Sequence, residues 1–425
     1  MSLVFRYSKN TSFDGEFFEP SFLQKRYQHF TQTINDPKFG FYMLKDWNDW
    51  ANQSEQVYQK FTHVEDFVHV GIGGSSLGPE MLVKALKPDS CKRKFTFINN
   101  VDPDEISSQF SSINWEKVLF YVVSKSGSTA ETMAAFIIIT NELIKRGISE
   151  SEFKNYIVVA TDPIKGELRQ LAKQWSLATL SVPENLGGRF CVFSSVGFFP
   201  AMMADINVKG LHTGVLSMQK ELISDDFDQN NLFKLCSVLM AGKQKGLGQT
   251  CLMPYSSKLR YLSNWFTQLW AESLGKRLNL SGEEVFEGLT PLSSYGATDQ
   301  HSQMQLFKEG PRDKFILFVE VLKTQSDFRL ENNIRLSAFK QLSPFSLAKL
   351  LQSELNGTLK ALQEADRPFV TIQMEKRDEL HISQLLLFLE SLTVLMGDYL
   401  NVNPFDQPGV EAGKKYAIEW LQSKS

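Results

Sequence analysis

The sequence predicts an α/β protein built on two mainly parallel sheets, each flanked by helices. Short, continuously apolar runs alternate with longer helical patterns, which is typical of parallel strands buried on both faces. This alternation occurs twice, once before about residue 205 and again after about residue 230. The length of 425 residues also exceeds what a single core usually serves, so we expect more than one domain.

The first half of the chain begins without a strand pattern. Residues 1–60 are aromatic and polar, and we expect helices and loops packed onto the later core. From residue 67 onward, five apolar runs predict strands. These strands are expected at 67–72, 95–101, 118–123, 156–161 and 179–182, with helices that include 129–146 and 164–175.

The second half repeats this arrangement and ends in one more helix. Strands are expected at 250–255, 315–322 and 369–374, and helices at 259–278, 343–362, 384–400 and 410–422. The predicted organisation is an N-terminal segment (1–60), a first α/β domain (61–205), a connection (206–230), a second α/β domain (231–408) and a C-terminal helix (409–425).

Composition excludes several classes of partner. Lys and Arg total 45 against 48 Asp and Glu, a net charge of -3, which argues against a broad nucleic-acid surface or a polybasic membrane patch. The charge-free stretch 190–204 is too short to span a membrane, and the apolar run 385–396 is interrupted by Glu390. The N-terminus lacks the apolar core of a secretory signal. Four scattered cysteines without CxxC spacing indicate reduced thiols in a cytoplasmic protein and no zinc site.

A glycine-rich loop, residues 71–78, lies between a predicted strand and a predicted helix. Glycines let backbone amides approach an anion at a helix N-terminus. The dinucleotide fingerprint GxGxxG fails because its sixth position is Ser76, although Asp102 follows the next strand. The loop therefore predicts either a phosphate contact or only a tight strand–helix turn. An NAD-dependent dehydrogenase is a competing function.

A hydroxyl-rich loop, residues 124–132, also follows a strand and opens a helix. It contains five hydroxyl side chains and Lys125. This combination suits a phosphate dianion, because charge-assisted hydrogen bonds and the helix dipole act together. The alternative is a capping box formed by Ser128 and Glu131. A cap needs only one hydroxyl, so the pattern favours phosphate.

Two further segments carry charged side chains that suit proton transfer. Arg189 follows two glycines, so it either stabilises a developing oxyanion or forms a structural ion pair. Gln268, Glu272 and Lys276 are spaced to share one face of the helix predicted at 259–278. Glu272 and Lys276 could be an ordinary surface pair. The helix is apolar over much of its circumference, however, and a partly buried carboxylate would be a usable general base.

The remaining polar candidates lie in two loops. The long loop 288–301 ends in His301, one of six histidines, which is either an acid–base group or a satisfied structural residue. The segment 403–414 is punctuated by proline and glycine and enters the last helix. Gln407 and Lys414 there either line the rim of a pocket or are ordinary exposed side chains.

Taken together, these segments resemble the phosphoglucose isomerase family. The resemblance runs from about residue 67 to 417 and rests on the order of VGIGGSSLGP, SKSGSTAET, GGRFCVFSSVG, QLWAESLGK, GLTPLSSYGATDQHS and NPFDQPGVEAGKK. It implies two sugar-isomerase (SIS) α/β domains, each a mainly parallel sheet flanked by helices. It also implies interconversion of glucose 6-phosphate and fructose 6-phosphate in glycolysis and gluconeogenesis, with no metal and no other cofactor.

The resemblance also implies roles for individual residues. Glu272 would move a proton between C2 and C1 through a cis-enediol(ate), which Arg189 would stabilise. His301 would help to open the sugar ring, with Lys414 at the ring oxygen. In this family the histidine comes from the neighbouring subunit, which implies an obligate homodimer. The implied substrate contacts are Gly74, Ser75, Ser124, Lys125, Ser126, Thr129, Thr132, Gln268 and Gln407.

The sequence departs from the family pattern at two loop positions. Pro408 stands where many members have tryptophan, and Gly127 stands where longer members have a bulky residue. These changes concern loop shape more than chemistry, and they bear on the detailed positions of Gln407 and Lys414. A third possible function is a non-catalytic SIS regulator, which would bind a sugar phosphate through the hydroxyl-rich loop.

Overall fold

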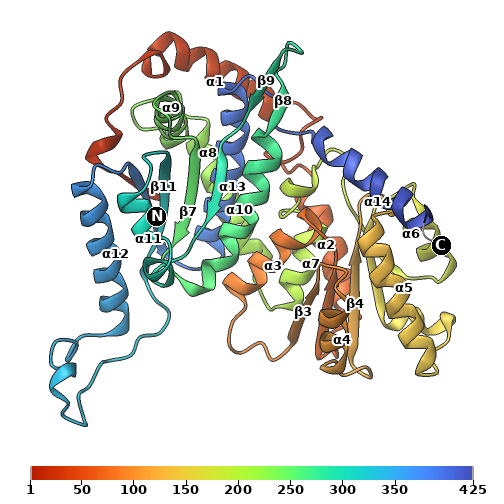
Figure 1. Ribbon diagram of the computed structural model, residues 1–425. Coiled ribbons are helices and arrows are strands. Elements are labelled where there is room, and N and C mark those ends of the chain that lie inside the picture. The colour runs from red at the N-terminus through yellow and green to blue at the C-terminus, as the bar shows by residue number, and fades with distance from the viewer. Residues whose placement is uncertain (1, 424–425) are drawn as a thin grey trace.

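The structure is a computed structural model that describes residues 2–423, and it contains two five-stranded sheets (Figure 1). The first sheet has the strand order β3-β2-β4-β5-β6, and every neighbouring pair is parallel. Its strands are β2 (Asp66–Val70), β3 (Lys94–Ile98), β4 (Val118–Val123), β5 (Ile157–Thr161) and β6 (Ala178–Ser181). All five lie where the apolar runs predict strands.

Helices cover both faces of the first sheet because its strands are apolar on both faces. Phe120 and Val122 of β4 pack into one core with α5 (Ala130–Lys145), whereas Leu119 and Tyr121 pack into another with α7 (Ser195–Met203). The other helices of this half are α2 (Trp47–Tyr58), α3 (Gly74–Leu86), α4 (Pro103–Ser111) and α6 (Glu167–Gln174).

The second sheet contains two strands that the sequence did not predict, Val4–Tyr7 and Thr290–Ser293, and the second of them lies in the segment 288–301 that was expected to be a loop. The strand order of this sheet is β1-β12-β11-β7-β10, and β1 (Val4–Tyr7) pairs antiparallel with β12 at the edge. The expectation of helices and loops alone in residues 1–60 is therefore wrong, because four residues are too few to establish a periodicity. The other strands are β7 (Gln249–Pro254), β10 (Thr290–Ser293), β11 (Lys314–Lys323) and β12 (Phe369–Lys376).

The helix α13 (Glu379–Tyr399) forms the centre of the second half. Among the described residues it is the only helix long and apolar enough to cross a membrane, but 94% of its apolar window is buried inside the protein. It is therefore a core helix. Burial also raises the pKa of Glu390 on this helix well above its usual value. The neighbouring helices are α8 (Val208–Leu222), α9 (Asn231–Gln244), α10 (Arg260–Leu274), α11 (Met304–Glu309) and α12 (Leu347–Glu364).

The predicted connection 206–230 contains α8, which packs closely on α13. The predicted domain boundaries stay a prediction. The helix expected at 259–278 is shorter, because the chain leaves α10 at Gly275. It then forms a hairpin of β8 (Lys276–Leu278) and β9 (Glu284–Glu287). The remaining helices are α1 (Pro20–Asn35) and the terminal α14 (Glu411–Ser423).

A glycine permits the close packing of α8 on α13. A Cβ added to Gly214 would overlap the carbonyl oxygen of Leu380 and the hydroxyl of Ser383. We therefore expect Gly214→Ala to lower the free energy of unfolding by about 1–3 kcal/mol, as overpacking does. Gly357→Ala on α12, where an added Cβ meets nothing within 4 Å, should instead stabilise the protein by about 0.5–1 kcal/mol. Urea denaturation measures both, and equal effects would contradict this account of the helix contact.

Candidate active site

Two of the polar loops singled out from the sequence lie beyond the carboxyl ends of the first sheet. The glycine-rich loop follows β2, and the hydroxyl-rich loop follows β4, which lies next to β2 in the sheet. In open parallel sheets, ligands bind at this edge, because the loops that leave neighbouring strands converge there.

The glycine-rich loop is held tightly against the loop that carries Arg189. A Cβ on Gly74 would overlap the backbone of Gly188 and lie 2.6 Å from the amide nitrogen of Arg189. The His69 Nε2 lies 2.7 Å from the carbonyl oxygen of Ser75. Burial lowers the pKa of His69 to about 4, so the ring is neutral at pH 7 and can donate this bond. Sequence analysis missed His69, although it stands in the strand just before the loop.

The hydroxyl-rich loop gathers its side chains at the start of α5. Thr129 is the N-cap, yet its hydroxyl makes no cap bond and instead lies 2.9 Å from Ser124 Oγ and 3.5 Å from Ser126 Oγ. The capping box of Ser128 and Glu131 is therefore wrong. The buried Thr132 hydroxyl has no partner within the described chain. The first amides of a helix also lack intrahelical partners, so this helix start offers several donors to an anion.

Lys125 joins the hydroxyl-rich loop to the loop that precedes Arg189. Its ammonium donates to the carbonyl oxygens of Glu184 at 2.7 Å and Leu186 at 2.9 Å. Burial lowers the pKa of Lys125. The ammonium thus stabilises the loop geometry and contributes positive charge beside the cluster of hydroxyls.

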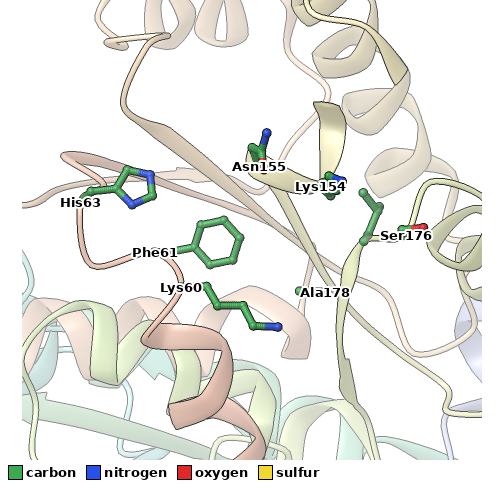
Figure 2. A pocket seen from close by; sticks show the side chains of 8 residues that line it. Lys60, Phe61, His63, Lys154, Asn155, Ser176 and Ala178 are labelled. Carbon is green, nitrogen blue, oxygen red and sulfur yellow. The ribbon is translucent and has the colours of Figure 1, made fainter. Parts of the chain in front are cut away.

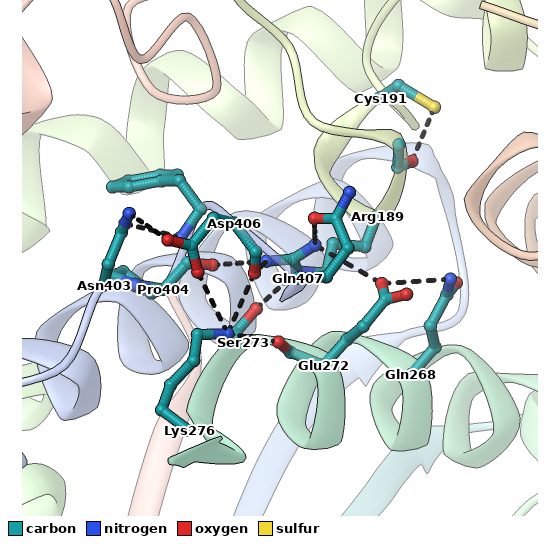
Figure 3. A network of polar contacts seen from close by, with 12 residues as sticks. Arg189, Cys191, Gln268, Glu272, Ser273, Lys276, Asn403, Pro404, Asp406 and Gln407 are labelled. Atoms are coloured by element: carbon teal, nitrogen blue, oxygen red, sulfur yellow. Dashed lines mark hydrogen bonds and ion pairs between the residues drawn. The ribbon is translucent and has the colours of Figure 1, made fainter. Parts of the chain in front are cut away.

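Arg189 is buried, with 2% of its side chain exposed, and it is the hub of the polar network (Figure 3). It donates five hydrogen bonds, which join α10 to the C-terminal segment 404–407. The acceptors are Ser273 Oγ (2.6 Å), Glu272 Oε2 (3.3 Å), Gln407 Oε1 (2.9 Å), Pro404 O (2.6 Å) and Asp406 O (3.0 Å). Burial lowers the pKa of Arg189, and the carboxylates of Glu272 and Asp406 act in the opposite direction.

Glu272 lies at the edge of this network, with 26% of its side chain exposed. Its Oε2 accepts from Arg189 and also from Gln268 Nε2 at 3.3 Å. Gln268 in turn lies close to the glycine-rich loop, because a Cβ on Gly73 would be 2.9 Å from its Nε2. The structure thus brings Glu272, Gln268, Arg189 and Gln407 together beside Gly74.

Lys276 does not share the helix face of Glu272. It begins β8, and its ammonium donates to the carbonyl oxygen of Glu272 at 2.6 Å, not to the carboxylate. The surface Glu–Lys pair considered from the sequence is therefore wrong. Sequence analysis also missed Ser273 and Asp406 as partners of Arg189. The only sequence signal for these two residues was that both lie within motifs quoted for the family resemblance.

His301 and Lys414 stand apart from this cluster. His301 ends a short 3-10 helix, Thr298–His301, and is exposed. No hydrogen bond or ion pair joins its ring to another residue between 2 and 423. Lys414 lies on α14, pairs with Glu411 at 2.8 Å and has 65% of its side chain exposed. A single chain thus assembles the carboxylate, guanidinium and hydroxyl groups without these two residues.

Three observations concern alternative sites and ligands. Asp102, the acidic residue that a dinucleotide site would need, instead caps α4 by accepting from the amides of Asp104 and Glu105. A surface cavity of about 450 Å³ near Lys60 and His63 lies at the amino ends of β5 and β6, away from the polar cluster (Figure 2). In the described part of the chain, no group of three His, Cys, Asp or Glu residues is arranged to hold a metal.

Solved structures share this fold. A hypothetical protein from Thermus thermophilus is 30% identical and superposes with a TM-score of 0.91 over 98% of this chain and all of that chain. A glucose-6-phosphate isomerase from Chlamydia trachomatis, 23% identical, has a TM-score of 0.77 over 89% of this chain and 74% of its own. A putative phosphosugar isomerase from Bacillus subtilis, 12% identical, reaches 0.51 over 86% of this chain and 98% of its own. The predicted SIS-type α/β fold is confirmed.

Sequence comparison agrees with the structural likeness. Residues 41–424 match the family model of phosphoglucose isomerase. The glucose-6-phosphate isomerase of Carboxydothermus hydrogenoformans is 37% identical over 86% of this chain and 80% of that protein. The enzyme of the same name from Rubrobacter xylanophilus is 38% identical over 90% and 88%, respectively. The chain belongs to the phosphoglucose isomerase family.

Proposed function

We propose that this aldose–ketose isomerase interconverts glucose 6-phosphate and fructose 6-phosphate at the cluster of Glu272 and Arg189. The observation that carries the proposal is the pairing of a partly exposed carboxylate with a buried, fully hydrogen-bonded guanidinium. A non-catalytic regulator would need the phosphate contacts but not this pair. The same proposal includes a cytoplasmic role in glycolysis and gluconeogenesis.

Glu272 is the base in the proposed reaction. Its carboxylate takes the proton from C2 of the open-chain aldose, which leaves a cis-enediolate, and returns it to C1. The hydroxyl proton moves from O2 to O1, so the product is an isomer and nothing is consumed. A positioned base of this kind contributes roughly 10²–10⁴-fold to the rate. Gln268 orients the carboxylate from one side and Arg189 from the other.

Arg189 stabilises the negative charge of the enediolate. Its guanidinium already makes five bonds to the protein, so its position is set before substrate arrives. Preorganised charge costs no reorganisation during the reaction, and this is why it favours the transition state. Gln407, which accepts from Arg189, is proposed to contact the same part of the substrate.

The phosphate of the substrate binds where two loops and two helix starts converge. The proposed contacts are the backbone at Gly74 and Ser75 and the hydroxyls of the loop 124–132, beside the charge of Lys125. Binding energy from this remote group orients C1 and C2 against Glu272 without reacting itself. The proposed set is Gly74, Ser75, Ser124, Lys125, Ser126, Thr129 and Thr132.

Ring opening needs an acid–base group that one chain does not supply at the cluster. We assign this step to His301 of a second copy in a homodimer, with Lys414 assisting at the ring oxygen. The support is the exposed, unbonded ring of His301 and the exposed Lys414, neither of which joins the described network. A two-fold dimer would then contain two composite sites.

Replacing the base should abolish turnover and keep binding. We expect Glu272→Gln to lower kcat by about 10²–10⁴-fold, because the amide cannot accept the proton. Fructose 6-phosphate should still bind, as measured by calorimetry. Glu375→Gln is a matched control, since Glu375 is 24% exposed and is also paired with a cation. A kcat within a few-fold of native for Glu272→Gln would refute the assignment of the base.

Removing a hydroxyl from the hydroxyl-rich loop should weaken substrate binding more than it slows turnover. We expect Thr129→Val to raise KM for fructose 6-phosphate by roughly 10-fold or more, since a hydrogen bond to a charged group is worth about 1.5–3 kcal/mol. Thr140→Val, farther along the same helix, where the hydroxyl bonds only Ile137 O, should leave KM unchanged. The coupled assay that forms NADPH from glucose 6-phosphate measures both. An unchanged KM for Thr129→Val would place the phosphate elsewhere.

The shared site can be tested by mixing two inactive variants. If His301 acts across the interface, a heterodimer of Glu272→Gln and His301→Ala subunits contains one intact site and one doubly defective site. Random reassociation of equal amounts makes about half of the dimers mixed, so activity should return to about a quarter of native. Mixtures that stay inactive, although reassociation is confirmed by differently tagged subunits, would mean that each chain uses its own histidine.

A further inference from the structure

Lys276 follows α10, the helix that carries Glu272, and is nearly as buried as Arg189, with 5% of its side chain exposed. Its ammonium donates to Glu272 O at 2.6 Å and to Asp406 O at 2.9 Å, and it lies 3.6 Å from Asp406 Oδ1. The first acceptor is in the last turn of α10, whose final carbonyls lack helical partners. The second belongs to the segment that carries Gln407. The Lys276 ammonium therefore joins the end of α10 to a residue that lies 130 positions farther along the chain than Lys276.

Two buried cations meet at a single acceptor. The Asp406 carbonyl oxygen accepts from Lys276 and, at 3.0 Å, from Arg189 (Figure 3). Burial lowers the pKa of Lys276, the charge of Arg189 lowers it further, and the carboxylates of Asp406 and Glu272 act in the opposite direction. With two cations and two carboxylates the group is neutral. The positive charge of the Lys276 ammonium compensates the negative charge of the Asp406 carboxylate. The Arg189 guanidinium then pairs with the Glu272 carboxylate.

We propose that Lys276 is a positioning residue of this active site, which sets the distance between the carboxylate of Glu272 and the 404–407 segment. The inference rests on the proposed function of Glu272 and Arg189. Lys276 does not touch the reacting atoms in this arrangement. It acts by fixing the last helical turn behind Glu272 and, at the same time, the backbone that precedes Gln407.

The packing around the segment explains why this bond matters. On one side, Phe405 is stacked on Phe39 with ring centroids 3.9 Å apart, so the segment is anchored to the N-terminal part of the chain. On the other side, residues 275–280, 403, 406, 408 and 409 line a cavity of about 680 Å³. Lys276 and Arg189 contribute hydrogen bonds that link this segment to the end of α10. Without Lys276, the segment has free volume into which it can shift.

The test separates turnover from binding. We expect Lys276→Met, which keeps the apolar stem but lacks the ammonium, to lower kcat by roughly 10–100-fold, because a small misplacement of catalytic groups costs about this much. KM for fructose 6-phosphate should change less than about threefold, because neither the glycine-rich loop nor the hydroxyl-rich loop contacts Lys276. A residue with a purely structural role would lower the unfolding temperature and leave kcat per folded molecule unchanged.

Lys314→Met provides the matched control. Lys314 is 7% exposed at its side chain and pairs with Asp313 at the start of β11, away from the polar cluster. The Lys314→Met variant should lose stability as Lys276→Met does, yet keep native kcat. Equal kcat losses in the two variants would overturn the proposal, because a general loss of stability would then explain both.

A second substitution covers failure of the methionine variant to fold. Lys276→Gln keeps a neutral N–H donor in the same polar site, but its side chain is one bond shorter and cannot reach both carbonyl oxygens. It should lose kcat in the same direction with KM kept. Native kcat in either folded variant overturns the proposal.

The same assays distinguish failure of this inference from failure of the proposed function. If Glu272→Gln is inactive and Lys276→Met has native kcat, only the role of Lys276 is wrong. If Glu272→Gln retains native kcat, the proposed site itself is wrong, and a loss in Lys276→Met would have to arise elsewhere.

Discussion

The buried guanidinium of Arg189 is the constraint on which the site depends. A charge removed from water must be paired and hydrogen-bonded, or it costs several kcal/mol. Arg189 meets this requirement with five acceptors, drawn from α10 and from residues 404–407. Satisfying the guanidinium therefore also fixes the position of the Glu272 carboxylate. Stability and catalytic geometry follow from the same set of bonds.

Close backbone approach makes this arrangement possible. Gly74 lies so near Gly188 that no side chain fits between them, and the neutral ring of His69 binds the carbonyl oxygen of Ser75. Lys125 then fastens the hydroxyl-rich loop to the same arginine loop. The amides and hydroxyls proposed to bind the phosphate are thus joined to the loop of Arg189, which pairs with the proposed base, and such a connection is what the use of binding energy from a remote phosphate requires.

The polar cluster divides into groups that one chain completes and groups that it does not. The carboxylate, the guanidinium and two side-chain amides come from both halves of the chain and contact each other directly, and Lys125 links the hydroxyl-rich loop to the loop that precedes Arg189. His301 and Lys414 instead lie on exposed elements. In the second half of the chain, α13 is apolar enough to suggest a membrane helix, but it is buried inside the protein.

The sequence by itself determined what depends on neighbours along the chain. Continuous apolar runs indicated the strands of the first sheet, whereas the anion site inferred from hydroxyls crowded at a helix start stays a prediction. Tertiary structure alone decided what depends on long-range contacts: Val4 of β1 pairs with Gln373 near the other end of the chain, and Arg189 binds Gln407 across 218 residues. Periodicity reports local conformation only. It therefore could not reveal that Lys276 leaves its helix to bind Asp406.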